Sequence, residues 1–212
     1  MIKISLKGLA KFMVGTSTQQ RKILRDFKYP DPEGTAQAVY YREARDIIEA
    51  FHGTGNDLAW LNEQAALLKN YASMASERSA SRLTNNARAL KMYGQHFGKR
   101  NFEILPPFKS RLEIEGVIIS IYPDLHVYEG ISERIIKLEF GKDLLGPLIP
   151  KIICQAMNEA TKLKGNTLKG NCINCFEVVT GTMYNSSPST SRLMRNIEDA
   201  CRNICAIWST LK

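Results

Sequence analysis

The sequence predicts an α/β (α+β) protein whose helical first half is followed by a small mixed sheet with helices on its sides. Two patterns along the chain predict this class. Apolar residues recur every three or four positions through the first hundred residues, and they alternate with polar residues from Arg111 onward. The length of 212 residues is enough for one full core. We expect a basic helical region over residues 1–101 and an α/β core over residues 102–212, or a single integrated domain.

The first hundred residues predict a series of amphipathic helices. Ser17 is expected to cap the second helix, which ends before the breaker sequence YPDPEG. The last helix of the series ends near Arg100, and its apolar residues follow one another at spacings of four, three, four and three. These residues are Leu83, Ala87, Leu90, Gly94 and Phe97. Such a stripe predicts one side buried against the rest of the protein and one side exposed.

The period of two that begins at Arg111 predicts strands. Leu112 and Ile114 share one face, and after Gly116 the apolar face switches. A glycine at such a change of phase predicts a bulge or bend. The sequence GISE is then expected to turn the chain into another strand over residues 134–140.

The remaining residues predict a helix, a strand and a long final helix. Pro147 and Pro150 introduce the first of these helices, and CFEVVTGTMY is expected to form one strand. An apolar stripe from Leu193 to Leu211 predicts the final helix. The second half is therefore expected to be a short sheet that helices cover.

The net charge of +8 is concentrated in the first half of the chain. Residues 1–100 hold 16 Lys and Arg against 9 Asp and Glu, a balance of +7, whereas residues 101–212 hold 13 against 12, a balance of +1. A positive field on one part of a protein favours a polyanionic partner such as nucleic acid. A basic surface that serves only solubility remains the alternative.

The last helix of the first half carries the densest basic cluster. Its polar side combines Lys and Arg with Asn85, Asn86 and Gln95, and Glu77 is its single acid. Amides beside cations suit contacts to phosphate and sugar, although a solvated helix face would have the same composition. The residues that we expect to bind nucleic acid are Arg78, Arg82, Arg88, Lys91, Lys99 and Arg100.

Charged side chains interrupt the otherwise apolar sequence VIISIYPDLHVYEGISERIIKLEF. Period-two geometry puts Asp124 opposite the apolar face of its strand, and it puts Lys137 and Glu139 on one face of the next strand. If both polar faces are the same side of the sheet, two carboxylates converge beside a lysine. Such a pair suits Mg²⁺ or Mn²⁺, which would activate a water near a phosphodiester while the lysine stabilises negative charge. A turn-flanking aspartate and an ordinary cross-strand Lys–Glu pair remain the alternative.

This region resembles the PD-(D/E)XK nuclease-like superfamily, especially its RecB-like branch. The resemblance rests on the dipeptide Pro-Asp that ends at Asp124, on the strand IIKLEF, and on the order of strands and helix over about residues 102–180. It implies a restriction-endonuclease-like core, in which a helix often presents a glutamine towards the site. The catalytic residues that it implies are Asp124, Glu139, Lys137 and Gln155, with Asp124 and Glu139 as the metal ligands. The motif is exchanged here, because Lys137 stands at the position of the second acid and Glu139 at the position of the lysine.

The resemblance implies a DNA-processing or DNA-binding protein, with phosphodiester hydrolysis by Mg²⁺ or Mn²⁺ if it is active, in mobile-element or antiviral defence. The exchanged motif leaves a second hypothesis, which is an inactive nuclease-fold subunit that binds nucleic acid or a protein partner in a larger complex. DNA is favoured over RNA, and a homo-oligomer is left open. A third hypothesis is a protein that binds other proteins and does not bind nucleic acid.

Other kinds of site have weaker support in the sequence. Cys172-x-x-Cys175 and Cys201-x-x-x-Cys205 supply four thiols, but the last two lie near the apolar stripe of the final helix, so core packing is favoured over zinc. The sequence has no phosphate-binding loop, dinucleotide fingerprint or nucleophile elbow. It also has no run of about 18 apolar residues and no secretory segment at its start. We therefore expect a cytoplasmic protein with reduced thiols and no membrane contact.

Overall fold

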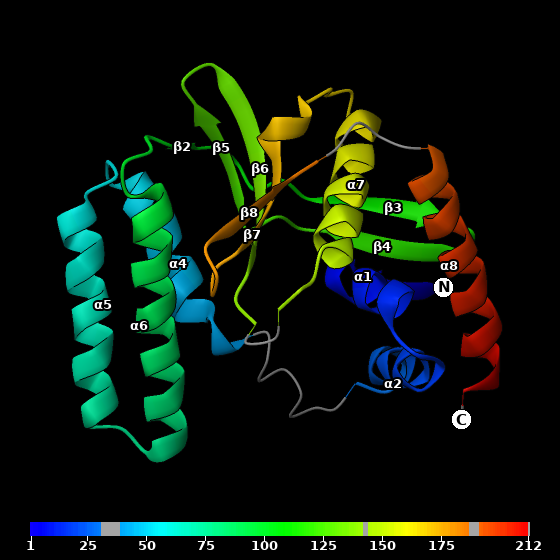
Figure 1. Cartoon of the computed structure of the whole chain (residues 1–212), viewed down its shortest axis with the longest axis horizontal. Coiled ribbons are helices and arrows are strands. Elements are labelled where there is room, and N and C mark those ends of the chain that lie inside the picture. Colours follow the sequence, from blue (N-terminus) through cyan, green and yellow to red (C-terminus); the bar gives the residue numbers. More distant parts are fainter. Residues whose placement is uncertain (31–38, 142–143, 187–190, 212) are drawn as a thin grey trace.

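Two β-sheets lie side by side between helices that cover both ends of the molecule (Figure 1). The computed structural model describes residues 1–30, 39–141, 144–186 and 191–211. The predicted α/β (α+β) class is confirmed, because these residues form helices and two mixed sheets. In spatial order, the three-stranded sheet consists of β1 (Ile2–Ser5), β4 (Val117–Ile121) and β3 (Ser110–Ile114). The five-stranded sheet consists of β2 (Glu103–Ile104), β5 (Leu125–Glu129), β6 (Ser132–Glu139), β7 (Ile173–Glu177) and β8 (Thr182–Asn185).

The three-stranded sheet differs from the expectation in two places. β1 lies in a stretch where only helices were expected, and it pairs in parallel with β4, more than one hundred residues away in the chain. At Gly116, where a bulge or bend was expected, the chain reverses completely between β3 and β4. Glu115 and Gly116 both have positive φ, 50° and 77°, as a two-residue hairpin turn requires. The apolar phase changes at Gly116 because one strand ends there and another begins.

The five-stranded sheet combines two hairpins with one parallel pair. β5 and β6 are antiparallel, as expected from the turn at GISE, and β6 is parallel to β7. The crossover between β6 and β7 contains α7 (Leu148–Leu163), which confirms the helix expected after Pro147. The single strand expected from CFEVVTGTMY is instead the hairpin of β7 and β8, with Gly181 in its turn at φ 68°.

The N-terminal helices pack with the C-terminal ones. α1 (Leu6–Val14) and α2 (Ser17–Lys28) contact α7 and the final helix, α8 (Ser191–Thr210). Thr16, rather than Ser17, is the N-cap of α2, because Thr16 and Gln19 form a reciprocal capping box. α2 ends at Lys28, and most of the expected breaker sequence lies outside the described residues.

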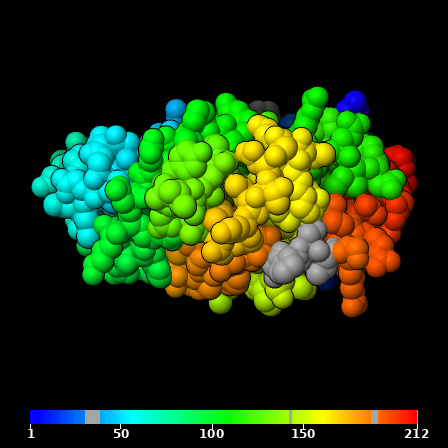
Figure 2. Space-filling model, turned by 90° about the horizontal axis from the view of Figure 1, so that it is seen from above, coloured from blue at the N-terminus to red at the C-terminus, as the bar shows by residue number. Residues whose placement is uncertain are grey.

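The other helices of the first half pack at the opposite end of the molecule (Figures 1 and 2). They are α4 (Arg42–Gly53), α5 (Leu58–Ser73) and α6 (Glu77–Phe97). The predicted stripe of α6 is buried at Ala87, Leu90, Gly94 and Phe97. A side-chain carbon added at Gly94 would lie 3.2 Å from two leucines of α5, so a glycine lets the two helices pack closely.

The five-stranded sheet separates two apolar cores. Ile135 and Ile173 belong to the core shared with α1, α7 and α8, whereas Ile136 and Phe176 belong to the core shared with α4, α5 and α6. Successive residues of β6 therefore point into different cores. None of the helices in the described part of the chain has the length and apolar character that a membrane span requires.

Candidate functional site

Asp124 lies immediately before β5, where the strand register puts it opposite Lys137 of β6. Its side chain is 8% exposed. Oδ2 accepts hydrogen bonds from Lys137 Nζ at 2.8 Å and from the Leu138 backbone N–H at 2.7 Å. Oδ1 accepts one from Arg45 Nε of α4, also at 2.8 Å. The structure thus brings Asp124 and Lys137 together, and both oxygens of the aspartate have protein partners.

Glu139 ends β6 and is almost completely buried, with 3% of its side chain exposed. Its Oε2 forms an ion pair with Lys7 Nζ of α1. Glu177 of β7 is its register partner, and the carboxylate of Glu177 accepts hydrogen bonds from Leu145 N and Thr180 Oγ1, both at 2.7 Å. Each of the two glutamates therefore has its own partners within the protein.

Lys7, Arg45, Asp124, Lys137 and Glu139 together form what we call the buried charge cluster. It contains three cations and two carboxylates, and it joins α1 and α4 to the five-stranded sheet. Buried charges are stable in proteins when they are paired in this way. Sequence reasoning identified the three residues of the sheet but missed Lys7 and Arg45. These two lie 132 and 79 residues from their partners, on ordinary amphipathic helices, and no local pattern marks them.

The buried thiol of Cys175 lies near the cluster, and the buried thiol of Cys154 lies next to Cys175. Burial raises the pKa of Cys154 to about 12. Burial, followed by the neighbouring Cys154 and Glu139, raises the pKa of Cys175 as well, and Lys137 and Lys7 only partly oppose this. Both thiols are therefore protonated at neutral pH and are poor nucleophiles and metal ligands.

The arrangement of the cluster does not fit Mg²⁺ or Mn²⁺. Three of the four oxygens of Asp124 and Glu139 already contact Arg45, Lys137, Lys7 or a backbone N–H. A divalent cation would have to displace these groups and would add charge to a cluster in which cations are already in excess. Within the described residues, no group of three or more His, Cys, Asp and Glu side chains is placed to hold a metal ion.

Gln155 lies in α7 and is 4% exposed. The hydrogen bond described for its amide nitrogen runs along the helix to Glu159 Oε1 at 2.9 Å. This hydrogen bond holds the amide nitrogen of Gln155 along its own helix.

Two of the basic residues expected to bind nucleic acid are engaged in ion pairs. Arg82 pairs with Glu43 of α4. Arg100 donates from Nε and an Nη atom to the two carboxylate oxygens of Glu129, each at 2.6 Å, and its guanidinium lies over the ring of Phe97. These hydrogen bonds from Arg100 lower the pKa of Glu129. Both arginines thus hold α6 and the segment after it to the rest of the fold.

The other four expected residues are exposed and have no ion pair among the described residues. Arg88 and Lys91 lie near the middle of α6, Arg78 lies in its first turn, and Lys99 follows its end. The exposed side of α6 thus carries positive charge that the described part of the protein does not neutralise.

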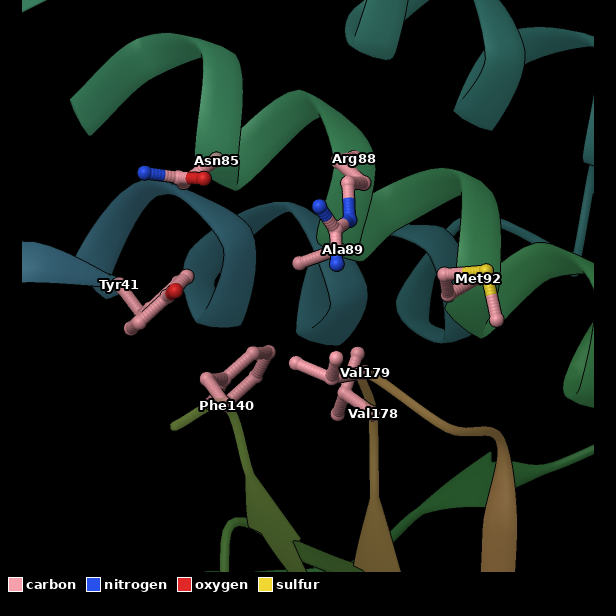
Figure 3. A pocket seen from close by; sticks show the side chains of 8 residues that line it. All are labelled: Tyr41, Asn85, Arg88, Ala89, Met92, Phe140, Val178 and Val179. Carbon is pink, nitrogen blue, oxygen red and sulfur yellow. The ribbon is translucent and has the colours of Figure 1, made fainter. Parts of the chain in front are cut away.

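A pocket of about 370 Å³ lies beside this exposed side of α6 (Figure 3). Arg88 reaches from α6 towards Phe140 and Val178, which follow the carboxyl ends of the parallel strands β6 and β7. Tyr41, which caps α4, stacks on Phe140 with ring centroids 5.0 Å apart. The lining residues are Tyr41, Asn85, Arg88, Ala89, Met92, Phe140, Val178 and Val179. Sequence reasoning did not predict this pocket, because its walls come from four separate segments.

The four thiols considered for zinc do not form one group within the described residues. Cys201 is buried in the core beneath α8, and Cys205 Sγ contacts the Glu115 carbonyl at 3.2 Å. Cys172 is buried directly before β7, and Cys175 is buried in the middle of that strand.

Comparison with known proteins does not assign the chain to a family. No protein-family model and no curated protein matches the chain. The function is therefore inferred from the arrangement of the residues alone.

Proposed function

We propose that the protein binds nucleic acid, with DNA favoured over RNA, through the exposed basic side of α6, and that the buried charge cluster is structural rather than catalytic. The observation that carries the proposal is that the exposed cations of α6 lack ion-pair partners within the described residues, whereas the carboxylates of the cluster have them. Arg78, Arg88 and Lys91 are exposed without an acidic partner in the described residues, whereas Asp124 and Glu139 are buried against cations of the same chain. Unpaired cations on one helix suit phosphate contacts, and neutralised carboxylates do not suit a metal.

A nuclease-like fold is part of this proposal. The order of elements supports it, since Asp124 precedes β5, Lys137 and Glu139 end β6, and α7 leads to the parallel strand β7. This is the succession that the resemblance to the PD-(D/E)XK superfamily implies. The exchanged lysine and glutamate explain why the fold would be kept for binding. All five cysteines are free thiols, which supports action in the reducing cytoplasm.

Binding to a fluorescent DNA duplex at several salt concentrations tests the proposal. We expect replacement of Arg78, Arg88 and Lys91 by alanine to weaken binding about tenfold or more and to reduce the salt slope by about three. The matched control replaces Lys11 of α1 and Arg21 and Arg25 of α2, which are also exposed, have no ion pair in the described residues and carry the same total charge. Equal weakening by both triple variants would overturn the assignment to α6, since only net charge would then matter.

Incubation of plasmid DNA with Mg²⁺ or Mn²⁺ tests the structural role of the cluster. We expect the plasmid to stay intact. Cleavage by the wild type that a folded Asp124→Asn variant lacks would show that the carboxylates do bind a metal and would contradict the structural role.

A further inference from the structure

The pocket beside α6 combines polar and apolar side chains on both of its walls. One wall is α6, with Arg88, Asn85, Ala89 and Met92, and the opposite wall contains Tyr41, Phe140 and the two valines after β7. Small-molecule sites in proteins combine apolar lining with a few polar groups in this way and have volumes of roughly 300 Å³ or more. At about 370 Å³ the pocket is large enough for one small ligand and too small for a duplex.

The polar groups of the pocket are available for a ligand. Arg88 has no ion pair among the described residues, and a guanidinium binds phosphate or carboxylate through paired hydrogen bonds. The amide nitrogen of Asn85 donates to Tyr40 Oη at 2.7 Å, which leaves its oxygen as an acceptor. Burial raises the pKa of Tyr41, so its hydroxyl keeps its proton and can donate. The site therefore offers one cation, one acceptor and one donor.

The position of the pocket in the fold also favours a ligand. Phe140 and Val178 directly follow the carboxyl ends of β6 and β7, which are parallel neighbours. In sheets with parallel strands and covering helices, ligands commonly bind outside the carboxyl ends of the strands. Arg45 supports this wall, because its guanidinium lies over the Phe140 ring at 4.9 Å while its Nε is held by Asp124.

We propose that this pocket binds one nucleoside phosphate, with the phosphate on Arg88 and the base against the apolar side chains of Phe140 and the two valines. The base can hydrogen-bond with Asn85 and Tyr41 through its edge. The ligand is either a free nucleotide or a terminal or unpaired nucleotide of a nucleic-acid strand. The inference rests on the proposed binding of nucleic acid, to which it adds a site for a single nucleotide.

Calorimetric titration with adenosine 5′-monophosphate tests the pocket, with adenosine and inorganic phosphate as partial probes. We expect saturable binding with Kd below about 1 mM, and weaker binding of each partial probe. Arg88→Ala should weaken binding on the order of tenfold, because it removes the phosphate contact. Met92→Trp should also weaken it by filling the cavity without any change in charge. Lys69→Ala is the matched control, since Lys69 of α5 is exposed, does not line the pocket and is not part of the proposed interface.

Displacement of a fluorescent adenosine monophosphate analogue identifies the source of the ligand. Displacement by a 5′-phosphorylated single strand, but not by the same strand without the phosphate, would assign the pocket to strand ends. Displacement by free nucleotides alone would assign it to a free nucleotide.

Duplex binding is measured on the same samples, so failure of the nucleotide pocket can be distinguished from failure of the proposed nucleic-acid interface. Duplex binding by a wild type that shows no saturable binding of the monophosphate would overturn the pocket and leave the α6 interface standing. Monophosphate binding that Arg88→Ala and Met92→Trp leave unchanged would also overturn it. Loss of duplex binding with intact monophosphate binding would instead contradict the proposed interface.

Discussion

The two faces of the five-stranded sheet differ in whether the charged side chains next to them have ion-pair partners within the protein. On the face towards α1 and α7, the partly buried Lys137 and the buried Glu139 are paired within the chain. On the face towards α6, the sheet contributes mainly apolar residues such as Ile136 and Phe176, and Arg88 lines a pocket there without an ion pair in the described residues. The paired charges stabilise the fold, whereas the charge of Arg88 is available to a partner. Both kinds of residue are charged in the sequence, and only their contacts in the structure distinguish them.

The two regions are physically connected through Arg45. Its Nε donates to Asp124, and its guanidinium covers Phe140, which lines the pocket. A change in the cluster is therefore expected to disturb the pocket as well as stability.

The largest expected effect follows from replacement of Asp124 by alanine. Arg45 and Lys137 would lose their carboxylate, and the Leu138 N–H would lose its acceptor. Removal of one partner from a buried ion pair typically costs about 3–5 kcal/mol, and we expect a loss of this size in the free energy of unfolding. Urea denaturation measures it.

The control for this loss is Asp26→Ala. Asp26 also accepts from a lysine at 2.8 Å, but its side chain is 60% exposed, so the expected loss is below about 1 kcal/mol. Similar losses for Asp26→Ala and Asp124→Ala would mean that the buried charge cluster contributes no more than a surface ion pair.

The second effect concerns the β7–β8 turn, which follows the pocket residues Val178 and Val179. Gly181 has φ 68°, and a side-chain carbon there would lie 1.9 Å from His96 Nε2 of α6. Gly181→Ala would therefore add backbone strain of about 1–2 kcal/mol and would also push His96 aside. We expect a lower free energy of unfolding and weaker monophosphate binding, because the turn would move away from α6.

Gly165→Ala separates the effect of backbone strain from the effect of the contact with His96. Gly165 has φ 79°, and nothing lies within 4 Å of the added carbon, so this variant carries the strain without the contact. If both alanine variants lose the same stability and the same monophosphate affinity, the contact between the turn and α6 has no role in the pocket.

Periodicity was sufficient to predict most of the elements, because buried helices and strands repeat their apolar residues at fixed spacings. It failed where long-range pairing decides the structure. β1 has only four residues and is a strand because β4 lies beside it, and the reversal at Gly116 depends on a positive φ at Glu115, which residue type does not predict. The hairpin of β7 and β8 was missed for a similar reason, since Gly181 was interpreted as a residue within one strand.

The candidate site shows the same division. The alternation of polar residues predicted that Asp124 would lie near Lys137 only if both polar faces were the same side of the sheet, and the strand register meets this condition. It could not predict that Lys7 and Arg45 would neutralise the carboxylates, since these contacts depend on how distant helices pack. It also could not separate Arg82 and Arg100, which are paired with glutamates, from Arg88, which is not.

The smallest expected effect is a pH dependence of the free energy of unfolding, which arises in the core between α4 and α6. His52 is buried, its Nε2 lies 2.5 Å from Tyr93 Oη, and its Nδ1 lies 2.5 Å from Asn56 Oδ1. Burial lowers the pKa of His52, an effect that the hydrogen bond to Asn56 opposes and Arg100 reinforces. The folded protein therefore holds His52 neutral in conditions where the unfolded chain, with a histidine pKa near 6.5, already binds a proton.

This difference in proton binding fixes the sign of the effect. Because the unfolded state binds more protons, the contribution of His52 to stability is fully present above about pH 6.5 and is lost as the pH falls towards the lowered pKa of the folded state. We expect the free energy of unfolding to decline between pH 7.5 and 5.5, and we expect His52→Gln to flatten this decline. His96→Gln, which replaces an exposed histidine of α6, is the matched control. If the decline persists in His52→Gln, its origin lies in another group, and the α4–α6 core does not carry the sensitivity to acid.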